Sequence, residues 1–457
     1  MESIDFSERI EVIGSPDVMV IGAGPAGIGA ALSAARLGKE VVVIEQTNAI
    51  GGIATSGLHG HICTYSSWSN PKEQVVGGIC REFADRVEAR GFGVFSGSSF
   101  DFEVEGFKLV LEEMFNEAGI KTYYYTQFSD VVVENETVKA VIIQSKNGRQ
   151  AFTPRMVIDC SGDADVAARA GVPFEQGRDN DGSTQPMTLM FQLGGVDVER
   201  VSQFRFHEYP EKYNDHNTYK MHALWKEAQD NGNMEPFQSG IMGWWYTPTR
   251  PDQLGINFTH IFGLDSTRVE DLTYATMEGR RQAYHSAEVY RKYVPGMENC
   301  WVSHCAALIG TRESRRIKGL YKITEQDLMA EKEFEDSIGY GSFFIDIHNC
   351  TGAGMDSGTW YPPQGFKYQI PYRALVPVNM NNLLVAGRCI SCTHTALGSL
   401  RVMPQCVLEG EACGAAAAQA IDDGAGVAEV SIPRLQQTLR DQGAIVSAGD
   451  IKAYQPR

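Results

Sequence analysis

The stretch that most constrains the fold is residues 17–52, "DVMVIGAGPAGIGAALSAARLGKEVVVIEQTNAIGG". An apolar run suited to a buried parallel strand leads into a helix expected over 26–37, and "KEVVVIE" returns as a neighbouring strand. Gly22 permits a tight turn, Gly24 lets the backbone approach a pyrophosphate, and Gly27 lets the helix pack closely on the strand. The helix N-terminus would direct its free N–H groups and positive dipole end at the phosphates. The stretch therefore predicts a dinucleotide-binding βαβ unit.

Glu45 ends the second strand, eighteen residues after Gly27. A carboxylate at this place can accept hydrogen bonds from both ribose hydroxyls of an adenosine, and it disfavours the 2′-phosphate of NADP. FAD and NAD share this half-site, so the sequence that follows has to distinguish them.

The following sequence favours FAD. After Gly52 the chain continues with a polar, glycine-rich loop, "GLHGHICTYSSWSN", where a plain NAD dehydrogenase usually adds another βαβ unit. Residues 130–153 are expected to form an antiparallel meander that leads into a buried strand over 156–160. An inserted meander of this kind is typical of FAD domains of the glutathione-reductase type.

Composition narrows the class of protein. A chain of 457 residues is expected to form more than one domain, and 43% hydrophobic with 21% charged residues is typical of a soluble globular protein. The net charge of -17 argues against binding to nucleic acid or to an anionic membrane surface. The chain shows no signal peptide and no membrane-spanning apolar run, and its ten cysteines lack disulfide-framework spacing. We therefore expect a cytoplasmic protein with reduced thiols.

Five stretches carry a resemblance to a known family. They are the opening stretch, "VIDCSGDADVAARAGVPF", "QPMTLMFQLGGVD", "IGTRESRRIKGLYKITEQD" and "YQIPYRALVPVNMNNLLVAGRCISCTHTALGSLRVMPQCVLEGEACGAAAAQAI". The sequence resembles the FAD-dependent oxidoreductases of the two-dinucleotide-fold superfamily, in particular the broad group whose substrates are mostly unassigned. The resemblance runs from residue 17 to about 421.

The resemblance implies an α/β fold: a Rossmann-like FAD-binding domain, with a parallel sheet and a β-meander insertion, plus a mixed α+β substrate domain. The FAD-binding domain would be discontinuous, over 1–170 and 360–457, with the substrate domain over 171–359. Noncovalent FAD would be held at Gly22, Gly24, Pro25, Ala26, Gly27, Glu45, Gly52, Ile53, Val131, Ser161, Gly162, Asp163, Gly387, Arg388 and Met403. Many relatives have an acid where Arg388 stands, so the contact with the ribityl hydroxyls stays open.

The C-terminal stretch has a pattern of its own. "NLLVAG", over 382–387, is an apolar strand expected at the sheet edge nearest the flavin. Pro404 suits the first residue of a following helix, where its missing N–H is no loss. Gly410, Gly414 and Ala418 recur every four residues and would form a smooth face for close packing. The N-terminus of that helix would point at the flavin and stabilise the charge of its reduced form.

No second nucleotide-binding unit is predicted. Gly352 and Gly354 follow an apolar segment, but Pro362 and Pro363 stand where a phosphate-binding helix would have to begin. Without a dedicated NAD(P)H domain, the flavin is expected to exchange electrons directly with a small organic substrate and with a separate carrier or oxygen. The aromatic middle segment favours an enclosed pocket for that substrate.

Four side chains are candidates for catalysis: His394, His348, Arg401 and Arg312. His394 follows the flavin-side strand and would either take a proton as hydride leaves the substrate or act as a hydrogen-bonding buttress. Arg401 would either anchor a carboxylate or pair with an acid at a domain interface, and Arg312 is the inward anchor we choose from "TRESRR". Asp346 and His348 alternate with apolar residues on an expected strand, so both point to one face, which is either the active-site wall or an internal polar pair.

Two groups have alternative interpretations. Cys389 and Cys392 in "CISC" are either a redox dithiol or two small residues packed near the cofactor, and the second is favoured. His59, His61 and Cys63 lie in a loop expected to pass along the isoalloxazine, where a covalent flavin link is conceivable but noncovalent FAD is favoured. No ligand set has the spacing of a metal site.

These observations predict an FAD enzyme that transfers a hydride between a CH–OH or CH–NH group of a small polar molecule and flavin N5. One alternative is reduction of an activated C=C bond, with an arginine or histidine supplying the proton. Another is an electron-carrying flavoprotein subunit that docks a partner. The sequence leaves the substrate, the electron acceptor and the oligomeric state open, a homo-oligomer included.

Overall fold

A computed structural model describes residues 4, 7–67, 72–202, 220–235, 243–352 and 354–455. Its central layer is a five-stranded sheet in which every adjacent pair of strands is parallel. In sheet order the strands are β21 (Leu383–Val385), β12 (Met156–Asp159), β2 (Val18–Ile21), β3 (Val41–Ile44) and β8 (Lys121–Tyr123). All but β8 are buried along their whole length, which is why they read as continuous apolar runs. The predicted α/β fold is confirmed.

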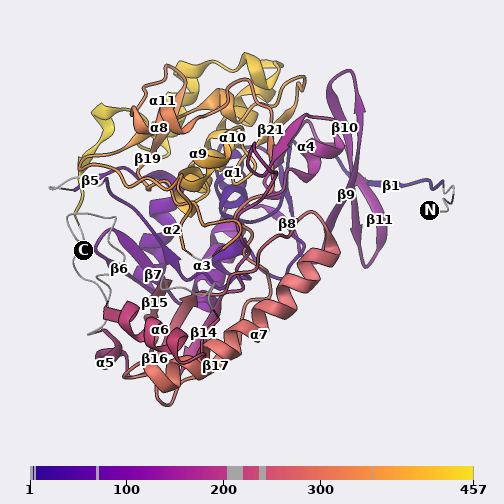
Figure 1. The fold of residues 1–457 in the computed structure, drawn as a ribbon. Coiled ribbons are helices and arrows are strands. Elements are labelled where there is room, and N and C mark those ends of the chain that lie inside the picture. Colours follow the sequence, from indigo (N-terminus) through magenta and orange to yellow (C-terminus); the bar gives the residue numbers. More distant parts are fainter. Residues whose placement is uncertain are drawn as a thin grey trace.

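Helices α1 (Pro25–Arg36) and α10 (Met403–Asp423) pack together against this sheet, side by side in Figure 1. A Cβ placed on Gly410 would lie 1.9 Å from the Ala26 carbonyl oxygen, and one on Gly414 would lie 2.4 Å from that of Ala30. Larger side chains would therefore force the helices apart. The close packing predicted from the spacing of these glycines is confirmed, and it joins the two ends of the chain.

The predicted meander is also confirmed. Strands β9 (Gln127–Glu134), β10 (Thr137–Ser145) and β11 (Gly148–Phe152) form successive antiparallel pairs, and β1 (Glu11–Gly14) adds in parallel to β11. This sheet lies at the right of the molecule in Figure 1, with α4 (Asp165–Arg169) packed against β9. The chain then returns to the central sheet through β12.

The middle of the chain forms a second, antiparallel sheet, shown at the bottom of Figure 1. Its order is β15 (Gly243–Thr247), β16 (Arg250–Asn257), β14 (Phe191–Gly194) and β17 (Trp301–Cys305). Trp225 from α6 (Lys220–Asp230), Tyr290 from α7 (Val269–Tyr293) and Phe258 fill its core, with ring centroids 5.4–5.7 Å apart. The domain boundaries remain a proposal.

Smaller elements complete the chain. The small sheets are β4 (His61–Ile62), β7 (Ser99–Phe102) and β6 (Gly93–Ser96); β13 (Phe174–Gln176) with β18 (Arg315–Ile317); β19 (Ser337–Gly341) with β20 (Tyr368–Pro371); and β22 (Lys452–Ala453) with β5 (Glu73–Gln74). The remaining α-helices are α2 (Gly78–Ala89), α3 (Val104–Glu117), α4 (Asp165–Arg169), α5 (Val198–Ser202), α8 (Glu325–Met329), α9 (His394–Leu400) and α11 (Ile432–Asp441).

The prediction of a regular strand around Asp346 and His348 is wrong. Residues 342–349 pair only through isolated bridges at Ile345 and His348. Just beyond the partner residue Trp360 stand Pro362 and Pro363, which lack the N–H groups that would continue the ladder. The alternation itself holds, because Ile345 is buried on one side while Asp346 and His348 share the other.

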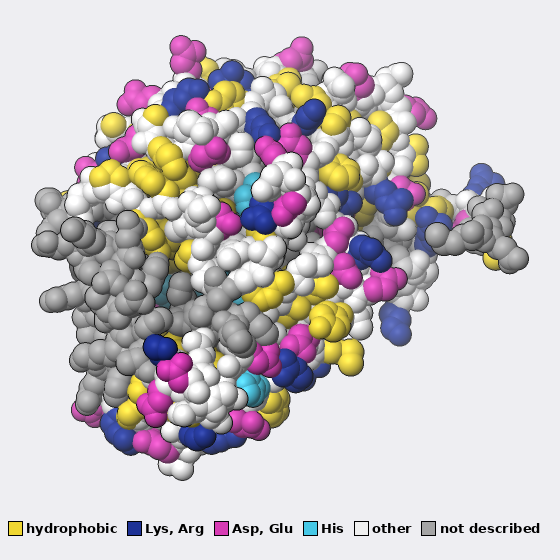
Figure 2. Space-filling model, viewed as in Figure 1, with side chains coloured by type: hydrophobic (Ala, Val, Ile, Leu, Met, Phe, Trp, Pro, Cys, Tyr) yellow, Lys and Arg dark blue, Asp and Glu magenta, His cyan; other side chains and the backbone are white. Residues whose placement is uncertain are grey.

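Over the described ranges, no helix is long and apolar enough to cross a membrane. The charged side chains on the face in Figure 2 are interspersed, acidic beside basic, without a broad basic area. That face therefore lacks the electrostatic footprint that a nucleic-acid surface requires.

Candidate active site

The glycine turn between β2 and α1 has the features of a phosphate cradle. A Cβ on Gly22 would lie 2.6 Å from the Cys160 carbonyl oxygen, and one on Gly27 would lie 2.0 Å from that of Gly22. Both glycines are thus required by the protein's own packing. Gly24 is different, because a Cβ there would meet no atom within 4 Å and its φ of -69° suits any residue. Gly24 caps α1 without a side-chain hydrogen bond, and the space beside it at the helix N-terminus is open.

Glu45 lies at the edge of this cradle and is 5% exposed. One carboxylate oxygen accepts a hydrogen bond from Ala23 N at 2.9 Å and the other from Thr47 N at 2.7 Å. These bonds hold the carboxylate next to the glycine turn, where the βαβ pattern requires an acceptor for ribose hydroxyls. The residues present therefore fit the adenosine diphosphate half of a dinucleotide.

The ends of β12 and β21 form the next part of the rim. Buried Asp159 accepts from Ser161 N at 3.1 Å and Ser161 Oγ at 2.6 Å, which fixes the turn at 161–163. Arg388 donates to Asp163 Oδ1 at 3.1 Å and to Thr311 O at 3.0 Å. The arginine that replaces the expected acid is thus paired with Asp163, an acid in the turn that follows the neighbouring strand β12.

A loop connects the cradle to a second group of polar side chains. Gly51 N donates to Ala23 O at 2.8 Å, and a Cβ on Gly52 would lie 2.9 Å from Gly24 Cα. Further along, His59 N donates to Ile53 O at 3.0 Å. The loop therefore places Gly51 and Gly52 against the cradle, and Ile53 connects it to His59.

His394, at the start of α9, is oriented by a buried acid. Its Nδ1 lies 2.8 Å from the carboxylate of Glu313, which is fully buried. Glu313 also accepts from Gln185 N at 3.2 Å and pairs with Arg316. An ionised carboxylate only accepts, so Nδ1 must carry the proton. In the neutral ring the other nitrogen, Nε2, is then an acceptor, and the described residues offer it no hydrogen-bond partner.

Arg312 and Arg401 lie close enough to affect each other electrostatically. Arg312 is 6% exposed and donates to Pro186 O at 2.7 Å and to Thr188 Oγ1 at 2.6 Å. Burial and the charge of Arg401 lower the pKa of Arg312 to about 9, which leaves it protonated near neutral pH. Arg401 donates to the carbonyl and carboxylate oxygens of Asp346 at 3.0 and 3.2 Å.

His348 and His260 form a hydrogen-bonded pair with a defined proton arrangement. His260 Nδ1 lies 3.0 Å from Phe258 O and must donate to it, so His260 Nε2 accepts from His348 Nδ1 at 3.1 Å. His348 Nε2 then faces Asp346 Oδ1 at 3.6 Å as an unprotonated nitrogen. Burial and the charge of Arg312 lower the pKa of His260 to about 3 and that of His348 well below its usual range, so both rings are neutral.

The histidines of the loop border the same group. His59 packs edge-on against Trp245 at a centroid distance of 5.0 Å, and burial lowers its pKa to about 3, with further lowering from His61, Arg312 and Arg401. His61 Nδ1 lies 2.5 Å from Oδ1 of buried Asp101. No covalent role follows from these contacts, so noncovalent FAD remains our prediction.

The structure therefore brings together the four predicted catalytic side chains, through contacts rather than sequence proximity. Glu313 adjoins Arg312 in the chain and holds His394, while Asp346 links Arg401 and His348. Asp346 was part of the prediction, whereas three further members of the group were not identified: Glu313, His260 and Gln185. Glu313 stands within "TRESRR", where the arginines drew attention, and a neutral histidine within an aromatic segment carries no signal of its own.

Other predicted positions lie as follows. Met403 begins α10. Val131 lies within β9, apart from the strand ends, and its N–H donates to the Asp130 carboxylate at 2.9 Å. Cys389 and Cys392 are buried free thiols, and burial raises the pKa of Cys389 well above its usual range and that of Cys392 to about 12. Such thiols favour packing over redox exchange.

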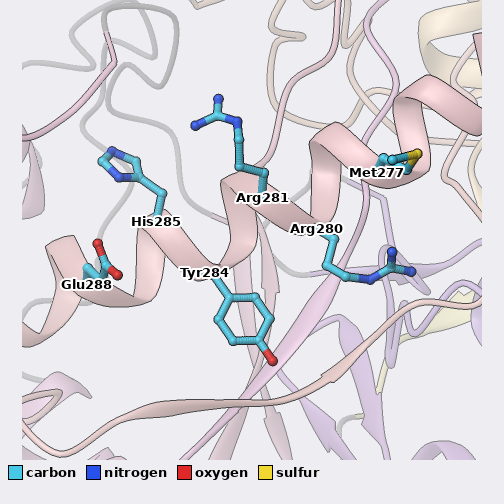
Figure 3. A pocket seen from close by; sticks show the side chains of 6 residues that line it. All are labelled: Met277, Arg280, Arg281, Tyr284, His285 and Glu288. Atoms are coloured by element: carbon cyan, nitrogen blue, oxygen red, sulfur yellow. The ribbon is translucent and has the colours of Figure 1, made fainter.

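A separate pocket lies on the outer face of α7. Its lining side chains all come from that one helix, as Figure 3 shows: Met277, Arg280, Arg281, Tyr284, His285 and Glu288. It contains none of the residues described above, and a convex helix face cannot enclose a small molecule. In the part of the chain that the structure describes, no group of three or more potential ligands is placed to hold a metal ion.

Comparison with known proteins identifies the family. The profile of the FAD dependent oxidoreductase family matches residues 17–439. The chain belongs to this family. FAD is therefore its cofactor, the phosphate cradle described above fits it, and the predicted resemblance is confirmed.

Curated relatives match over shorter segments. The chain is 27% identical over 203 residues to digeranylgeranylglycerophospholipid reductase 1 of Methanococcoides burtonii, a match that spans 41% of this chain and 46% of that protein. It is 31% identical over 127 residues to thiamine thiazole synthase of Aeropyrum pernix, a match that spans 28% of this chain and 43% of that protein. The matches thus span less than half the length of these relatives. Among solved structures, the chain is similar to a geranylgeranyl bacteriochlorophyll reductase-like protein from Thermoplasma acidophilum. The structural match spans 94% of this chain and 84% of that protein, at 12% sequence identity and a TM-score of 0.46.

Proposed function

We propose that this FAD-dependent oxidoreductase oxidises a CH–OH or CH–NH group of a small polar molecule. The observation that carries the proposal is the His394–Glu313 pair, in which a buried carboxylate holds Nδ1 at 2.8 Å and leaves Nε2 as an acceptor. Bound FAD supplies a two-electron acceptor for the hydride. The protein itself has to supply the base that removes the substrate's other hydrogen as a proton.

His394 performs that step. As the substrate loses a hydride from carbon, Nε2 takes the proton of its O–H or N–H group, and a C=O or C=N bond forms. The imidazolium that results is stabilised by Glu313 through the Nδ1–H bond. Glu313 is in turn fixed by Arg316 and by Gln185 N, so the base is oriented before the substrate binds.

The residues that hold FAD follow from the cradle. The N-terminus of α1 and Gly24 would bind the pyrophosphate, Glu45 the ribose, and Asp163 with Arg388 the region of the ribityl chain. Met403 and Gly387 would lie toward the isoalloxazine, since both stand at the ends of elements that lead to this rim. Each assignment remains part of the proposal.

Reduction of an activated C=C bond is the second candidate. It is supported by the reductase name of one curated relative and by buried Arg312, whose pKa burial and Arg401 lower to about 9, making it a better proton donor than an ordinary arginine. The two candidates differ in direction. Oxidation of a substrate requires oxidised flavin at the start, and reduction of a double bond requires flavin that has already been reduced.

The test is anaerobic bleaching of the oxidised flavin band by a panel of sugars, hydroxy acids, amino acids and unsaturated acids, followed by admission of air. The proposal expects an alcohol or amine to bleach the band in the absence of any protein partner. Reoxidation by unsaturated acids alone, after chemical reduction, would replace it with the second candidate. Bleaching only in the presence of a partner protein would indicate an electron-carrying subunit.

A further inference from the structure

The group around Arg312 contains an imbalance of charge. In the described part of the chain, Arg401 and Asp346 are the charged side chains that act on Arg312. Asp346 is already bound to Arg401, with Oδ2 at 3.2 Å from the guanidinium. The three histidines beside them are neutral, since burial lowers the pKa of each. Two guanidiniums therefore share one carboxylate, which leaves an excess of one positive charge.

Neighbouring ion pairs do not remove this excess. His61 is paired with Asp101, and Glu313 with Arg316, so each pair is neutral overall. The acceptors of Arg312 itself are a carbonyl, a hydroxyl and an amide: Pro186 O, Thr188 Oγ1 and Asn257 Oδ1. Burying a charge among neutral acceptors is costly, and natural proteins usually pair such a group. A bound anion would complete the site.

We propose that this excess charge binds a carboxylate of the substrate, so that the enzyme acts on a small hydroxy or amino acid. The assignment rests on the proposed function, because it concerns the same site. Arg312 donates to Pro186 O, and the adjacent Gln185 N donates to Glu313, which holds His394, so the guanidinium and the imidazole border the same short segment. A short molecule can therefore present its carboxylate to the arginine and its CH–OH or CH–NH group to the base.

Gln185 is a second, independent indication of a ligand. Gln185 is 2% exposed, and its side-chain Oε1 accepts a hydrogen bond from His348 N at 3.2 Å. Its main-chain N–H donates to Glu313 at 3.2 Å. The amide Nε2 is buried and has no acceptor in the described ranges. An unused buried donor is unfavourable for the protein alone. A carboxylate that already contacts Arg312 has a second oxygen to accept from it.

The size of the excess favours a carboxylate over a phosphate ester. A carboxylate carries one negative charge near neutral pH, which matches the single excess charge. A phosphate monoester carries close to two, because its second pKa is about 6. The remaining negative charge would be buried beside neutral histidines, where burial opposes their protonation.

The experiment measures binding to the oxidised, FAD-loaded full chain without turnover. The carboxylate probes are acetate, benzoate and gluconate, and each is compared with a neutral counterpart: acetamide, benzamide or glucose. Inorganic phosphate and glycerol phosphate are the dianionic probes. Binding is followed by perturbation of the flavin absorption band and by the shift of the thermal unfolding midpoint. At least one carboxylate should bind roughly tenfold or more tightly than its neutral counterpart, as expected for a charge-assisted hydrogen bond.

Variants then locate the site. Arg312→Gln should lower the affinity for the carboxylate roughly tenfold to hundredfold. Arg312→Lys keeps the charge and should retain part of that affinity. The control is Arg373→Gln, which removes a cation already paired with Asp336 at 2.9 and 3.1 Å. Flavin content and the urea midpoint report whether each variant is folded, and a misfolded Arg312→Gln would be replaced by the lysine variant together with Gln185→Met.

Three results would overturn the inference: no carboxylate binding more tightly than its neutral counterpart, unchanged affinity in folded Arg312 variants, or tighter binding of the dianions. The proposed function fails separately. If carboxylates bind through Arg312 but no alcohol or amine bleaches the flavin, the oxidation proposal is wrong and the anion site stands. If neutral alcohols bleach it and carboxylates do not bind, only the anion site is wrong.

Discussion

His61 and Asp101 form a buried pair whose loss should be measurable without any substrate. Asp101 is fully buried, its Oδ1 lies 2.5 Å from His61 Nδ1, and its Oδ2 has no partner in the described residues. His61→Gln would leave this carboxylate without its counter-charge. Breaking a buried ion pair by removing one partner costs about 3–5 kcal/mol, so we expect the free energy of unfolding to fall by about that amount near neutral pH.

The pH dependence follows from the same pair. Burial alone would lower the pKa of His61, but hydrogen bonds to Asp101 and Cys63 outweigh it and raise the pKa from 6.5 to about 10. A group whose pKa is raised by folding stabilises the protein fully below its ordinary pKa and loses that contribution as pH rises through the folded value. The difference between the wild type and His61→Gln should therefore be largest below pH 6.5 and disappear above about pH 10.

The assay is urea denaturation followed by circular dichroism across that pH range. His304→Gln is the matched control, since His304 is exposed on β17 and its loss should change stability by less than about 0.5 kcal/mol. Adding Asp101→Asn to His61→Gln should recover much of the lost stability by removing the unpaired charge. An equally stable His61→Gln, or a loss of stability that does not vary with pH, would refute the reasoning.

Three further predictions concern the cofactor and the base. Glu45→Ala should lower FAD affinity roughly tenfold to hundredfold, because the ribose loses a charged acceptor worth ~1.5–3 kcal/mol; fluorescence titration of the apoprotein measures this, and unchanged affinity would place the adenosine elsewhere. Heat or acid should release free FAD, whereas colour that stays with the denatured chain would indicate a covalent link at His59, His61 or Cys63. Glu313→Gln should slow flavin reduction by at least about tenfold, measured by stopped flow, and an unchanged rate would show that His394 needs no carboxylate.

The βαβ unit was predictable because its determinants are local. Three glycines, an apolar strand and an acid occur within one short stretch, and each residue acts on neighbours close in sequence. The pairing of α1 with α10 was predictable for a different reason. Gly410 and Gly414 produce a periodic smooth face, which indicates close packing even when the partner helix is unknown.

The active-site network was only partly predictable, since its members come from separate segments. The sequence shows that His394 and Arg312 are candidates, but no periodicity indicates that Glu313 contacts a histidine 81 positions away. The pairing of His260 with His348 spans 88 positions in the same way. Such contacts depend on tertiary packing, so residue type alone identifies the participants and the fold identifies their partners.

The role of His394 as the base is tested most directly by anaerobic stopped-flow reduction of the His394→Asn variant with the alcohol or amine that bleaches the wild type. Asparagine keeps a similar size and one hydrogen bond but cannot accept the proton. Flavin content should be unchanged, since the phosphates are bound by backbone N–H groups. The account predicts reduction slower by ~10²–10⁴. Reduction at the wild-type rate would contradict it and leave His348 or the His59–His61 loop as the source of the base.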